Sequence, residues 1–594
     1  MVTYADRPWL NNYDPGVPHT LEPYPNQPVH QFLRDTAKQF PDRAALITSV
    51  KLPGFGRQAA QITYAQLDRY SDALATGLVN LGLKRGGRVA LIMPNVAAFL
   101  ISYYAVYKAG GVVAACNPTY PPEKMQFQIN DCDAEFVITL SMFYNMVKEI
   151  QPRTKVKTVI ATNVKDFFPP IGKALFTLAM EKKGGHRVTL QPGDHWLREI
   201  LKIFDGQRPN VEVKPIDLAI FQYTGGTTGI SKGAMSQHKA VVANTLQMKA
   251  WTFAQNNDPN LQKDFEHMTF LGAIPMFHAY GMIVMIGISV VLGGTIVLVP
   301  NARDIDDVVD IIAHFKPTAF NGVPALFNAI VNHPRVKSGE VDLKSIRISS
   351  SGAAPLPPAT KREFEQRISG KLTEGYGMSE APTASTSNPF AGENRTGSVG
   401  MPLPDMELSI VDVDTGENEL PVGEIGEIIM TGPNLMLGYH NMPTETANTL
   451  RVRPDGKTWL YSGDIGYMDA DGYFYIVDRK KDMALIGGFN VYPNNIEKVL
   501  KEHPAVLEVG VAAVPHPDAR RQGEESLKAW IVLKPGTSVT EQELIDHCSK
   551  YLAGYEVPRR ISFIPELPKT IVGKTLRREL VRLEMEDREN ANAK

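Results

Sequence analysis

A stretch of twenty residues without a charged side chain, GMIVMIGISVVLGGTIVLVP at positions 281–300, most constrains how this chain can fold. A segment of this length and polarity is long enough to cross a bilayer. However, Gly293 and Gly294 interrupt it, a dense run of β-branched residues follows at positions 295–299, and no basic cluster flanks either end. These features favour a buried helix followed by a buried parallel strand over a membrane span.

The same pattern occurs earlier in the chain. Residues 88–118 contain a strand (VALIMPN), an apolar helix (VAAFLISYYAVYKA), a Gly-Gly pair and a second strand (VVAACNP). Residues 268–301 repeat this order with FLGAIPMFH, an apolar helix, a Gly-Gly pair and TIVLVPN, and an amphipathic helix and a further strand follow each unit. Alternation of this kind predicts two related α/β halves built on doubly wound parallel sheets.

The composition excludes several classes of protein. A hydrophobic content of 43% excludes a disordered or collagen-like chain. The 62 basic and 64 acidic side chains give a net charge of -2, so we expect no nucleic-acid partner. Three cysteines without a CxxC pair argue against a disulfide framework or zinc ribbon, and the first residues lack the apolar core of a secretory signal. We therefore expect a cytoplasmic protein.

Changes in composition mark further units. The segment KALFTLAMEKK at positions 173–183 predicts a surface helix, with peripheral contact to the inner membrane face as the alternative. Short alternating segments between residues 401 and 439 predict a small antiparallel β unit. The charged run DRKKD at positions 478–482 precedes a strand and helix pattern. We expect the chain to divide there, into domains of residues 1–478 and 479–594.

The strongest local motif is YTGGTTGISKG at positions 223–233, directly after the apolar strand DLAIFQ. Its glycines let the backbone approach an anion, its threonine hydroxyls can donate to phosphate oxygens, and a lysine supplies positive charge. It is not a Walker A loop, because Ser231 precedes the lysine and Gly233 follows it. The motif predicts a phosphate site formed by Thr224, Gly225, Gly226, Thr227, Thr228, Gly229 and Lys232.

Six more motifs follow in order: PMFHAYG (275–281), SSGAAPL (350–356), EGYGMSE (374–380), YSGDIG (461–466), VDRKKDMALIGGFNVYP (477–493) and LPKTIVGKTLRREL (567–580). With the loop, they resemble the signatures of the adenylate-forming superfamily of acyl-CoA synthetases, luciferases and peptide-synthetase adenylation domains. The wording is most similar to that of bacterial long-chain fatty-acid:CoA ligases. The resemblance implies two related doubly wound α/β subdomains and a small β unit in a large N-terminal domain, followed by a small mobile α+β C-terminal domain.

The resemblance also implies how ATP and Mg²⁺ would be bound. It places adenine against the flat face of Tyr376 and the ribose hydroxyls on Asp464, with Arg479 as the partner of that carboxylate. Mg²⁺ would lie on oxygens of Glu380 and Thr224. The implied ATP-binding residues beyond the loop are Gly352, Ala353, Ala354, Glu374, Gly375, Tyr376, Gly377, Met378, Ser379, Asp464 and Arg479.

For the acyl group and coenzyme A, the resemblance implies a second set of residues. It places His278 beside the fatty-acid carboxylate, where it would shape the pocket entrance, whereas an isolated histidine at a strand end is more often a core residue. A carboxylate is already ionised at pH 7 and needs no base to deprotonate it. Gly281 and Val323 would line the acyl side. Gly487 and Gly488 would line the pantetheine tunnel, with an ordinary turn as the alternative.

Lys574 is the sharpest catalytic candidate. The resemblance places it on the α-phosphate and the substrate carboxylate, where a cation stabilises the charge that builds up on phosphorus. The other catalytic candidates are Glu380, Lys232 and His278. Lys574 and the thiol of coenzyme A would compete for one face of acyl-AMP, so the C-terminal domain would rotate between two half-reactions. The implied hinge comprises Asp478, Lys481 and Asp482.

The expected activity is that of an acid-thiol ligase that uses ATP, Mg²⁺ and coenzyme A to convert a medium- or long-chain fatty acid into its thioester through acyl-AMP. An aryl- or short-chain acid:CoA ligase is one alternative, because those enzymes share every motif named above. An enzyme that stops at acyl-AMP, a non-catalytic acyl- or nucleotide-binding protein and a transporter are the others. The expected partners are small-molecule substrates, with peripheral membrane contact and a homodimer left open.

Overall fold

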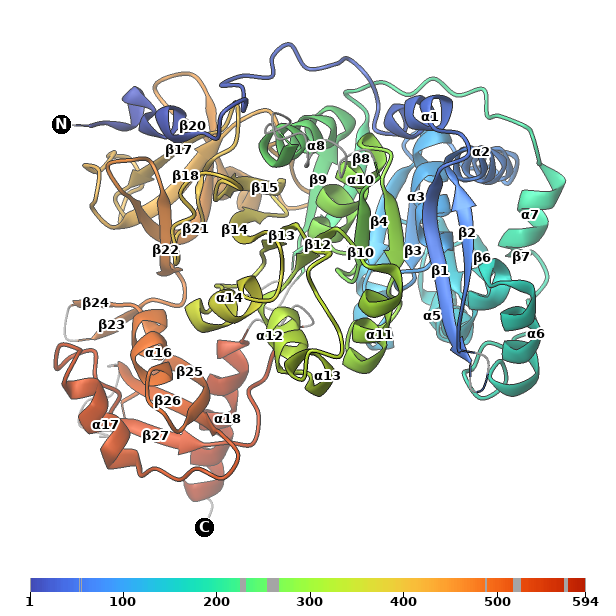
Figure 1. Ribbon diagram of the computed structural model, residues 1–594. Coiled ribbons are helices and arrows are strands. Elements are labelled where there is room, and N and C mark those ends of the chain that lie inside the picture. Colours follow the sequence, from blue (N-terminus) through green and yellow to red (C-terminus); the bar gives the residue numbers. More distant parts are fainter. Residues whose placement is uncertain are drawn as a thin grey trace.

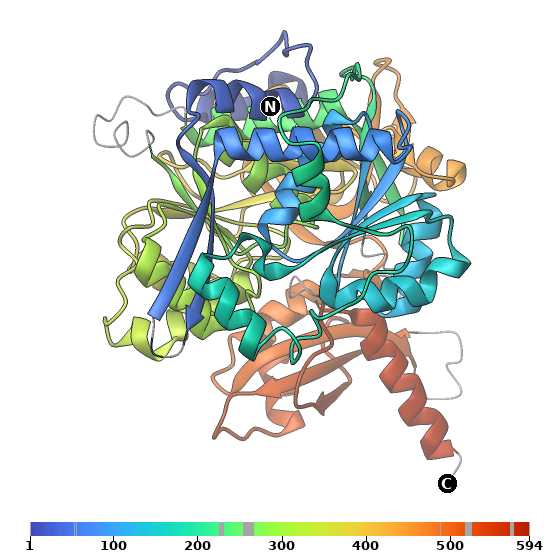
Figure 2. The same ribbon diagram turned by 90° about the vertical axis from the view of Figure 1, so that its right-hand side faces the viewer.

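The computed structural model describes residues 2–52, 54, 56–224, 231–253, 267–486, 489–516, 525–570 and 575–592. Figure 1 shows a large body that holds the chain up to strand β22, and a smaller lobe, in orange and red, that holds the elements after it. Figure 2, turned by 90°, shows the same lobe beneath the body, with the C-terminus at its far end.

One sheet of the body has eight strands. Six of its strands, β8, β4, β3, β5, β6 and β7, lie parallel in that order, and the antiparallel strands β9 and β19 close one edge. In sheet order the strands are β19 (Gly438–Tyr439), β9 (Gly233–Gln237), β8 (Leu218–Tyr223), β4 (Val112–Cys116), β3 (Arg88–Ile92), β5 (Phe136–Leu140), β6 (Thr158–Thr162) and β7 (His195–Trp196).

A second sheet has nine strands. It is parallel from β1 through β11, β10, β12 and β13 to β14, and antiparallel strands close both edges. In sheet order the strands are β16 (Met401–Pro402), β15 (Ala381–Ser387), β14 (Lys371–Met378), β13 (Ile348–Ser351), β12 (Ala319–Gly322), β10 (Thr269–Gly272), β11 (Thr295–Leu298), β1 (Ala44–Leu52) and β2 (Gly56–Thr63).

The two sheets contain the predicted repeat. In the first, β3 lies between β4 and β5, and in the second, β10 lies between β11 and β12, so each half has the strand order second, first, third. The helices between these strands also correspond. They are α3 (Ala97–Lys108) and α4 (Pro122–Asp131) in the first half, and the π-helix η6 (Tyr280–Met285) with α10 (Ile286–Val291), then α11 (Ile305–Phe315), in the second.

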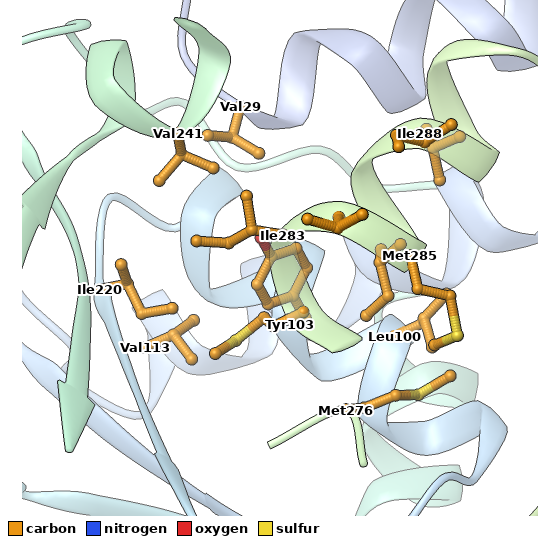
Figure 3. Close-up of a cluster of buried hydrophobic side chains, with 14 of the residues drawn as sticks. Val29, Leu100, Tyr103, Val113, Ile220, Val241, Met276, Ile283, Met285 and Ile288 are labelled. Carbon is orange, nitrogen blue, oxygen red and sulfur yellow. The ribbon is translucent and has the colours of Figure 1, made fainter. Parts of the chain in front are cut away.

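The apolar helices of the two halves meet in one core. Every residue of α3 is buried, and so are most residues of η6 and α10. Figure 3 shows Leu100 and Tyr103 of α3 in the same cluster as Ile283, Met285 and Ile288. Burial on all sides explains the twenty uncharged residues, and no helix in the described ranges is both long and apolar enough to span a bilayer.

The small β unit is larger than the prediction from residues 401–439. Its five strands are β17 (Glu407–Val411), β18 (Gly426–Thr431), β20 (Leu450–Val452), β21 (Thr458–Met468) and β22 (Phe474–Arg479). The two ends of the predicted segment belong elsewhere, because β16 joins the nine-stranded sheet and β19 joins the eight-stranded sheet. Pairing with strands outside this segment decides this, with β15 just before it for β16 and with β9 about 200 residues earlier for β19, and local alternation carries no such information.

The smaller lobe is an α+β unit with its own core. Its sheets are formed by β23 (Ala484–Ile486) with β24 (Phe489–Val491), and by β25 (Val506–Pro515), β26 (Glu525–Leu533) and β27 (Arg560–Phe563). Helices α16 (Pro493–Lys501) and α18 (Arg577–Asn592) both contact β25. Among the described residues, its two hydrophobic clusters draw on positions from Ala484 onward. The predicted α/β architecture with a small α+β C-terminal unit is confirmed.

Candidate active site

Three neighbouring parallel strands of the nine-stranded sheet carry several of the predicted nucleotide- and acyl-binding residues at their carboxyl ends. Val323 follows β12, residues 352–354 follow β13, and residues 374–378 form the end of β14. Registers of β12 with β13 and of β13 with β14 bring Gly322, Ser351 and Glu374 side by side. Crevices outside the carboxyl ends of parallel strands are the usual ligand sites of such sheets.

The loop after β13 is held in an unusual backbone conformation. Ala353 has a φ of 69°, in the left-handed region that residues with a Cβ atom rarely adopt. The backbone N–H of Leu356 donates to Oε1 of Glu374 over 2.9 Å, and burial raises the pKa of this carboxyl to about 7. The side chain of Glu374 therefore holds the loop that contains Gly352 and Ala354. This contact is made with the protein backbone.

Strands β14 and β15 approach each other very closely at Gly377. A Cβ atom there would lie 1.5 Å from the carbonyl oxygen of Thr383, so only glycine fits. At Gly375, a Cβ atom would lie 3.0 Å from the oxygen of Thr386. The two glycines therefore shape the part of β14 that contains Tyr376. Met378 and Ser379 come next in the chain, and both are half-buried.

Asp464 is the centre of a buried polar cluster. It is 3% exposed and accepts a hydrogen bond of 2.7 Å from the hydroxyl of Tyr376 through Oδ2. Its Oδ1 pairs with Nε of Arg479 over 3.0 Å, because Asp464 on β21 lies directly opposite Arg479 on β22. A carboxylate oxygen has two lone pairs, so both oxygens can still accept from further hydroxyl groups.

Glu380 is connected to Lys232 by a residue that sequence reasoning missed. The hydroxyl of Tyr439 donates to Oε1 of Glu380 over 2.6 Å, and the Lys232 ammonium lies 4.9 Å from the centre of the Tyr439 ring. Tyr439 reaches this place because β19 pairs with β9, which begins at Gly233. The sequence signalled Tyr439 only as the end of a β segment.

The base of the phosphate loop is closed by hydrogen bonds. The N–H of Thr224 donates to the oxygen of Lys232 over 3.0 Å, and the Ser231 hydroxyl donates to the oxygen of Thr224 over 2.6 Å. Below it, the Tyr223 hydroxyl donates to Oδ2 of Asp131 over 2.7 Å. The predicted residues Gly225, Gly226, Thr227, Thr228 and Gly229 lie outside the described residues.

Three cations influence one another near this loop. Burial, together with the charges of Arg479 and Lys232, lowers the pKa of Lys481 to about 8, against the opposing effect of Asp482 and Asp464. The pKa of Arg479 is raised, chiefly by Asp464. Cations that lie close together repel one another, and a polyanionic ligand such as a nucleoside triphosphate would relieve this repulsion.

The residues around Glu380 fit a magnesium ion that arrives with phosphates. Burial raises the pKa of Glu380, so a divalent cation beside it would stabilise the ionised form. Within the described ranges, no group of three His, Cys, Asp or Glu side chains forms a dedicated metal site. Mg²⁺ is commonly held by one or two protein oxygens together with substrate phosphates, which agrees with Glu380 and Thr224 as the candidate ligands.

His278 is uncharged at neutral pH, because burial lowers its pKa to about 4. Its Nδ1 accepts from the N–H of Tyr280 over 3.3 Å, so the neutral ring carries its proton on Nε2. The Tyr280 hydroxyl lies 2.7 Å from Oγ of Ser350 at the end of β13. A Cβ atom on Gly281 would lie 2.3 Å from the oxygen of Pro275, so glycine is needed where η6 begins.

The predicted hinge residues lie at the junction with the smaller lobe, where β22 ends. Asp478 is buried at the end of β22, and Lys481 and Asp482 lie in the turn that follows. Val323 is half-buried at the start of α12 (Pro324–Asn332). Gly487, Gly488 and Lys574 lie outside the described residues.

Comparisons with known proteins agree with this architecture. The family described as "AMP-binding enzyme" matches residues 33–440, and "AMP-binding enzyme C-terminal domain" matches residues 495–574. The chain is 37% identical to a long-chain-fatty-acid–CoA ligase of Bacillus subtilis over 98% of this chain and 99% of the relative. It is 31% identical to 4-coumarate–CoA ligase 2 of Nicotiana tabacum over 93% and 94% of the two chains.

Solved structures give the same result. The crystal structure of ATP-bound MatB from Rhodopseudomonas palustris matches with a TM-score of 0.78 and 28% identity, over 94% of this chain and 99% of that one. The anthranilate CoA ligase AuaEII in complex with anthranoyl-AMP matches with a TM-score of 0.77 at 24% identity, over 98% of both chains, which supports the fold alone. The chain belongs to the AMP-binding enzyme family.

Proposed function

We propose that this protein is an ATP-dependent long-chain fatty-acid–CoA ligase. In the first half-reaction, an oxygen of the fatty-acid carboxylate attacks the α-phosphorus of ATP, giving acyl-AMP and pyrophosphate. In the second, the thiol of coenzyme A attacks the acyl carbon, giving acyl-CoA and AMP. The observation that carries this proposal is a pair of contacts between the three sheets of the body. Tyr376 binds Asp464, and Tyr439 joins Glu380 to Lys232, in a chain 37% identical to a ligase of this name.

In the adenylation step, each of these residues binds or orients one part of the nucleotide. Tyr376 supplies a flat face for adenine, and Asp464, held by Arg479, accepts the ribose hydroxyls. Lys232 binds the outer phosphates, and Mg²⁺, when bound by Glu380 and Thr224, neutralises phosphate charge. Lys574 binds the α-phosphate and the entering carboxylate, and neutral His278 can donate from Nε2 to that carboxylate without competing for a proton.

The thioester step needs a different arrangement of the two domains. Lys574 and the thiol approach the same face of acyl-AMP, so the unit of residues 479–594 must turn relative to residues 1–478. Two observations support this division. The five-stranded sheet ends at Arg479, and the described residues after it have hydrophobic clusters of their own. Gly487 and Gly488 would then face the pantetheine arm, since glycine permits close approach.

The acyl chain would enter from the His278 side, where the buried core is rich in methionine. Met276, Met282 and Met285 lie in the cluster around η6, and methionine side chains adapt readily to irregular space. The π-helix is itself a conformation that recurs at functional sites. Gly281 lies within η6, and Val323 follows β12.

A peripheral contact with the cytoplasmic face of a membrane would give this enzyme access to its substrate. Helix α6 (Pro170–Ala179) lies at the outer edge of the body (Figure 1) and leaves Ile171, Leu178 and Met180 exposed by 55%, 84% and 51%. Exposed Lys182 and Lys183 follow it. Apolar residues beside lysines suit an anionic lipid surface. Sedimentation with anionic vesicles tests this contact, and Leu178→Glu should abolish it. A homodimer formed through the same surface would appear instead as a doubled molecular mass in solution.

One panel of acids tests the function and its alternatives. Acids from C4 to C18 and 4-coumarate are each incubated with ATP, Mg²⁺ and coenzyme A, and release of AMP and thioester is measured. We expect the highest kcat/KM with C12 to C18 chains. The 31% identity to 4-coumarate–CoA ligase 2 makes the aryl acid the main competitor. Pyrophosphate release without thioester would instead indicate an enzyme that stops at acyl-AMP, and no pyrophosphate release would indicate a binding protein.

A further inference from the structure

Arg577 is the first residue of α18 and is bound on every side. Its side chain is 13% exposed, and its guanidinium donates to two carboxylates of the hinge segment and to two residues of α16. Nη1 donates to Asp478 over 3.1 Å and to Asp482 over 3.2 Å. Nη2 donates to Glu497 over 2.8 Å and also contacts Oδ1 of Asn494.

The partners of Arg577 lie on both sides of the candidate hinge. Asp478 belongs to β22, where it is paired with Ile465 in the five-stranded sheet of the body. Asp482 is the last residue of the DRKKD run, and Glu497 lies within the smaller lobe, where it also accepts from the N–H of Val511 on β25. Arg577 therefore crosses the junction, and its contact with Asp478 depends on how the two domains are oriented.

Both carboxylate oxygens of Asp478 are hydrogen-bonded at this junction. Asp478 is fully buried, and its second oxygen accepts from the N–H of Asn494 over 2.8 Å. Its first oxygen also accepts from the N–H of Arg479 over 2.7 Å. A buried carboxylate left without its cationic partner is costly. Loss of Arg577 should therefore loosen the body strand and the lobe helix at the same point.

Arg577 lies three residues after Lys574 in the chain. Lys569 forms a bridge with Thr575, and the N–H of Leu576 donates to the oxygen of Pro568 over 2.8 Å. These contacts join the described residues on either side of positions 571–574. The ion pairs of Arg577 thus fix the chain directly after Lys574 relative to the hinge.

We propose that Arg577 is a positioning residue, a clasp that links the hinge carboxylates to the chain directly after Lys574, and that the domain orientation it holds here is the adenylate-forming one. The clasp rests on the proposed two-step reaction, in which Lys574 serves adenylation alone. Rotation toward the thioester-forming orientation requires that Arg577 release Asp478. The residue touches neither nucleotide nor acyl group and acts through Lys574 and the hinge.

The first test separates the half-reactions in Arg577→Lys and Arg577→Gln. Lysine keeps the charge but lacks the planar fork that reaches four partners. We expect acyl-AMP formation to fall at least tenfold in both variants, while conversion of supplied acyl-AMP and coenzyme A to thioester stays within twofold. Arg582→Gln is the matched control, because Arg582 lies on the same helix and pairs only locally with Glu579 and Glu586. An equal fall in both half-reactions would overturn the clasp.

The second test does not depend on activity. The hinge segment contains Arg479, Lys480 and Lys481, so trypsin can report its opening. We expect tryptic cleavage after Lys480 or Lys481 to be at least fivefold faster in Arg577→Lys and in Asp478→Asn than in the wild type or Arg582→Gln. Unchanged cleavage would overturn the clasp even if the protein proved to be a ligase. Faster cleavage in a protein without ligase activity would contradict the proposed function and leave the clasp standing.

Discussion

The hydroxyl of Tyr439 donates a hydrogen bond of 2.6 Å to Glu380, while the ring of the same tyrosine lies 4.9 Å from the ammonium of Lys232. One side chain thus connects the candidate magnesium ligand with the lysine that ends the phosphate loop. Tyr439 and Glu380 are each 7% exposed, so water cannot readily replace the hydrogen bond. This relationship leads to the first prediction.

Tyr439→Phe should weaken adenylation while preserving the fold. Removing a hydrogen bond to a charged group costs about 1.5–3 kcal/mol, which corresponds to roughly tenfold to hundredfold in rate. We expect this loss in pyrophosphate release, with a higher Mg²⁺ concentration needed for half-maximal rate, because Glu380 would be less firmly oriented. Tyr551→Phe, at a residue 64% exposed, is the matched control. An unchanged magnesium dependence would contradict the link.

The repeated α/β halves could be predicted from the sequence because local patterns determine them. The Gly-Gly pairs and the apolar runs mark α3, η6 and α10, and the strands on either side are short and rich in β-branched residues. The family resemblance of the motifs also named Asp464 and Arg479, which the β21–β22 pairing brings face to face.

The contacts of Tyr439 and Arg577 could not be predicted in this way. Tyr439 reaches Lys232 through a pairing of strands about 200 residues apart, and Arg577 reaches Asp478 across 99 residues. Nothing in the local pattern of either segment specifies the partner. The contact of Glu374 with the backbone of Leu356 could not be predicted either, because a carboxylate that holds a neighbouring loop carries no local mark of it in a sequence.

Lys574→Ala should abolish acyl-AMP formation and leave thioester formation from supplied acyl-AMP within about twofold of the wild type. The lysine would stabilise charge only in the adenylation transition state, and removal of one such group typically costs a hundredfold or more. Quenched-flow measurement of each half-reaction checks this, with Lys550→Ala, at an exposed position, as the control. An equal loss in both halves would exclude a lysine that acts in one orientation only.

Gly488→Leu should have the opposite effect. A leucine side chain would occupy space that the pantetheine arm needs, so thioester formation should fall at least tenfold while pyrophosphate release in a single turnover is preserved. Rapid-quench assays with and without coenzyme A measure the two quantities. Thioester formation at the wild-type rate would place the tunnel elsewhere.

Gly377→Ala should destabilise the protein. The added Cβ atom would lie 1.5 Å from the Thr383 oxygen, so β14 and β15 would have to separate at the point where Tyr376 is presented. Steric overlap of this kind typically costs about 1–3 kcal/mol or more. Calorimetry should show a lower unfolding temperature and weaker ATP binding, whereas Gly554→Ala, with no atom within 4 Å of the new Cβ, should leave both unchanged.

The affinity for ATP should fall as the pH rises through about 8. Burial, together with Arg479 and Lys232, lowers the pKa of Lys481 from 10.5 to about 8. In the free protein, protonated Lys481 therefore lowers the free energy of unfolding below pH 8. This destabilisation disappears as the pH rises from about 8 to 10.5. A bound triphosphate reverses the balance, because its negative charge stabilises the ammonium, and binding should be coupled to proton uptake near pH 8.

Calorimetric titration with ATP between pH 7 and 9.5, in buffers of different ionisation enthalpy, measures both the affinity and the protons taken up. Lys481→Arg keeps its charge throughout this range, so the decline near pH 8 should be absent in that variant. Lys480→Arg is the matched control, because Lys480 pairs with Glu427 over 3.0 Å, and it should retain the decline. A decline that persists in Lys481→Arg would assign the titration to another group and remove Lys481 from the phosphate site.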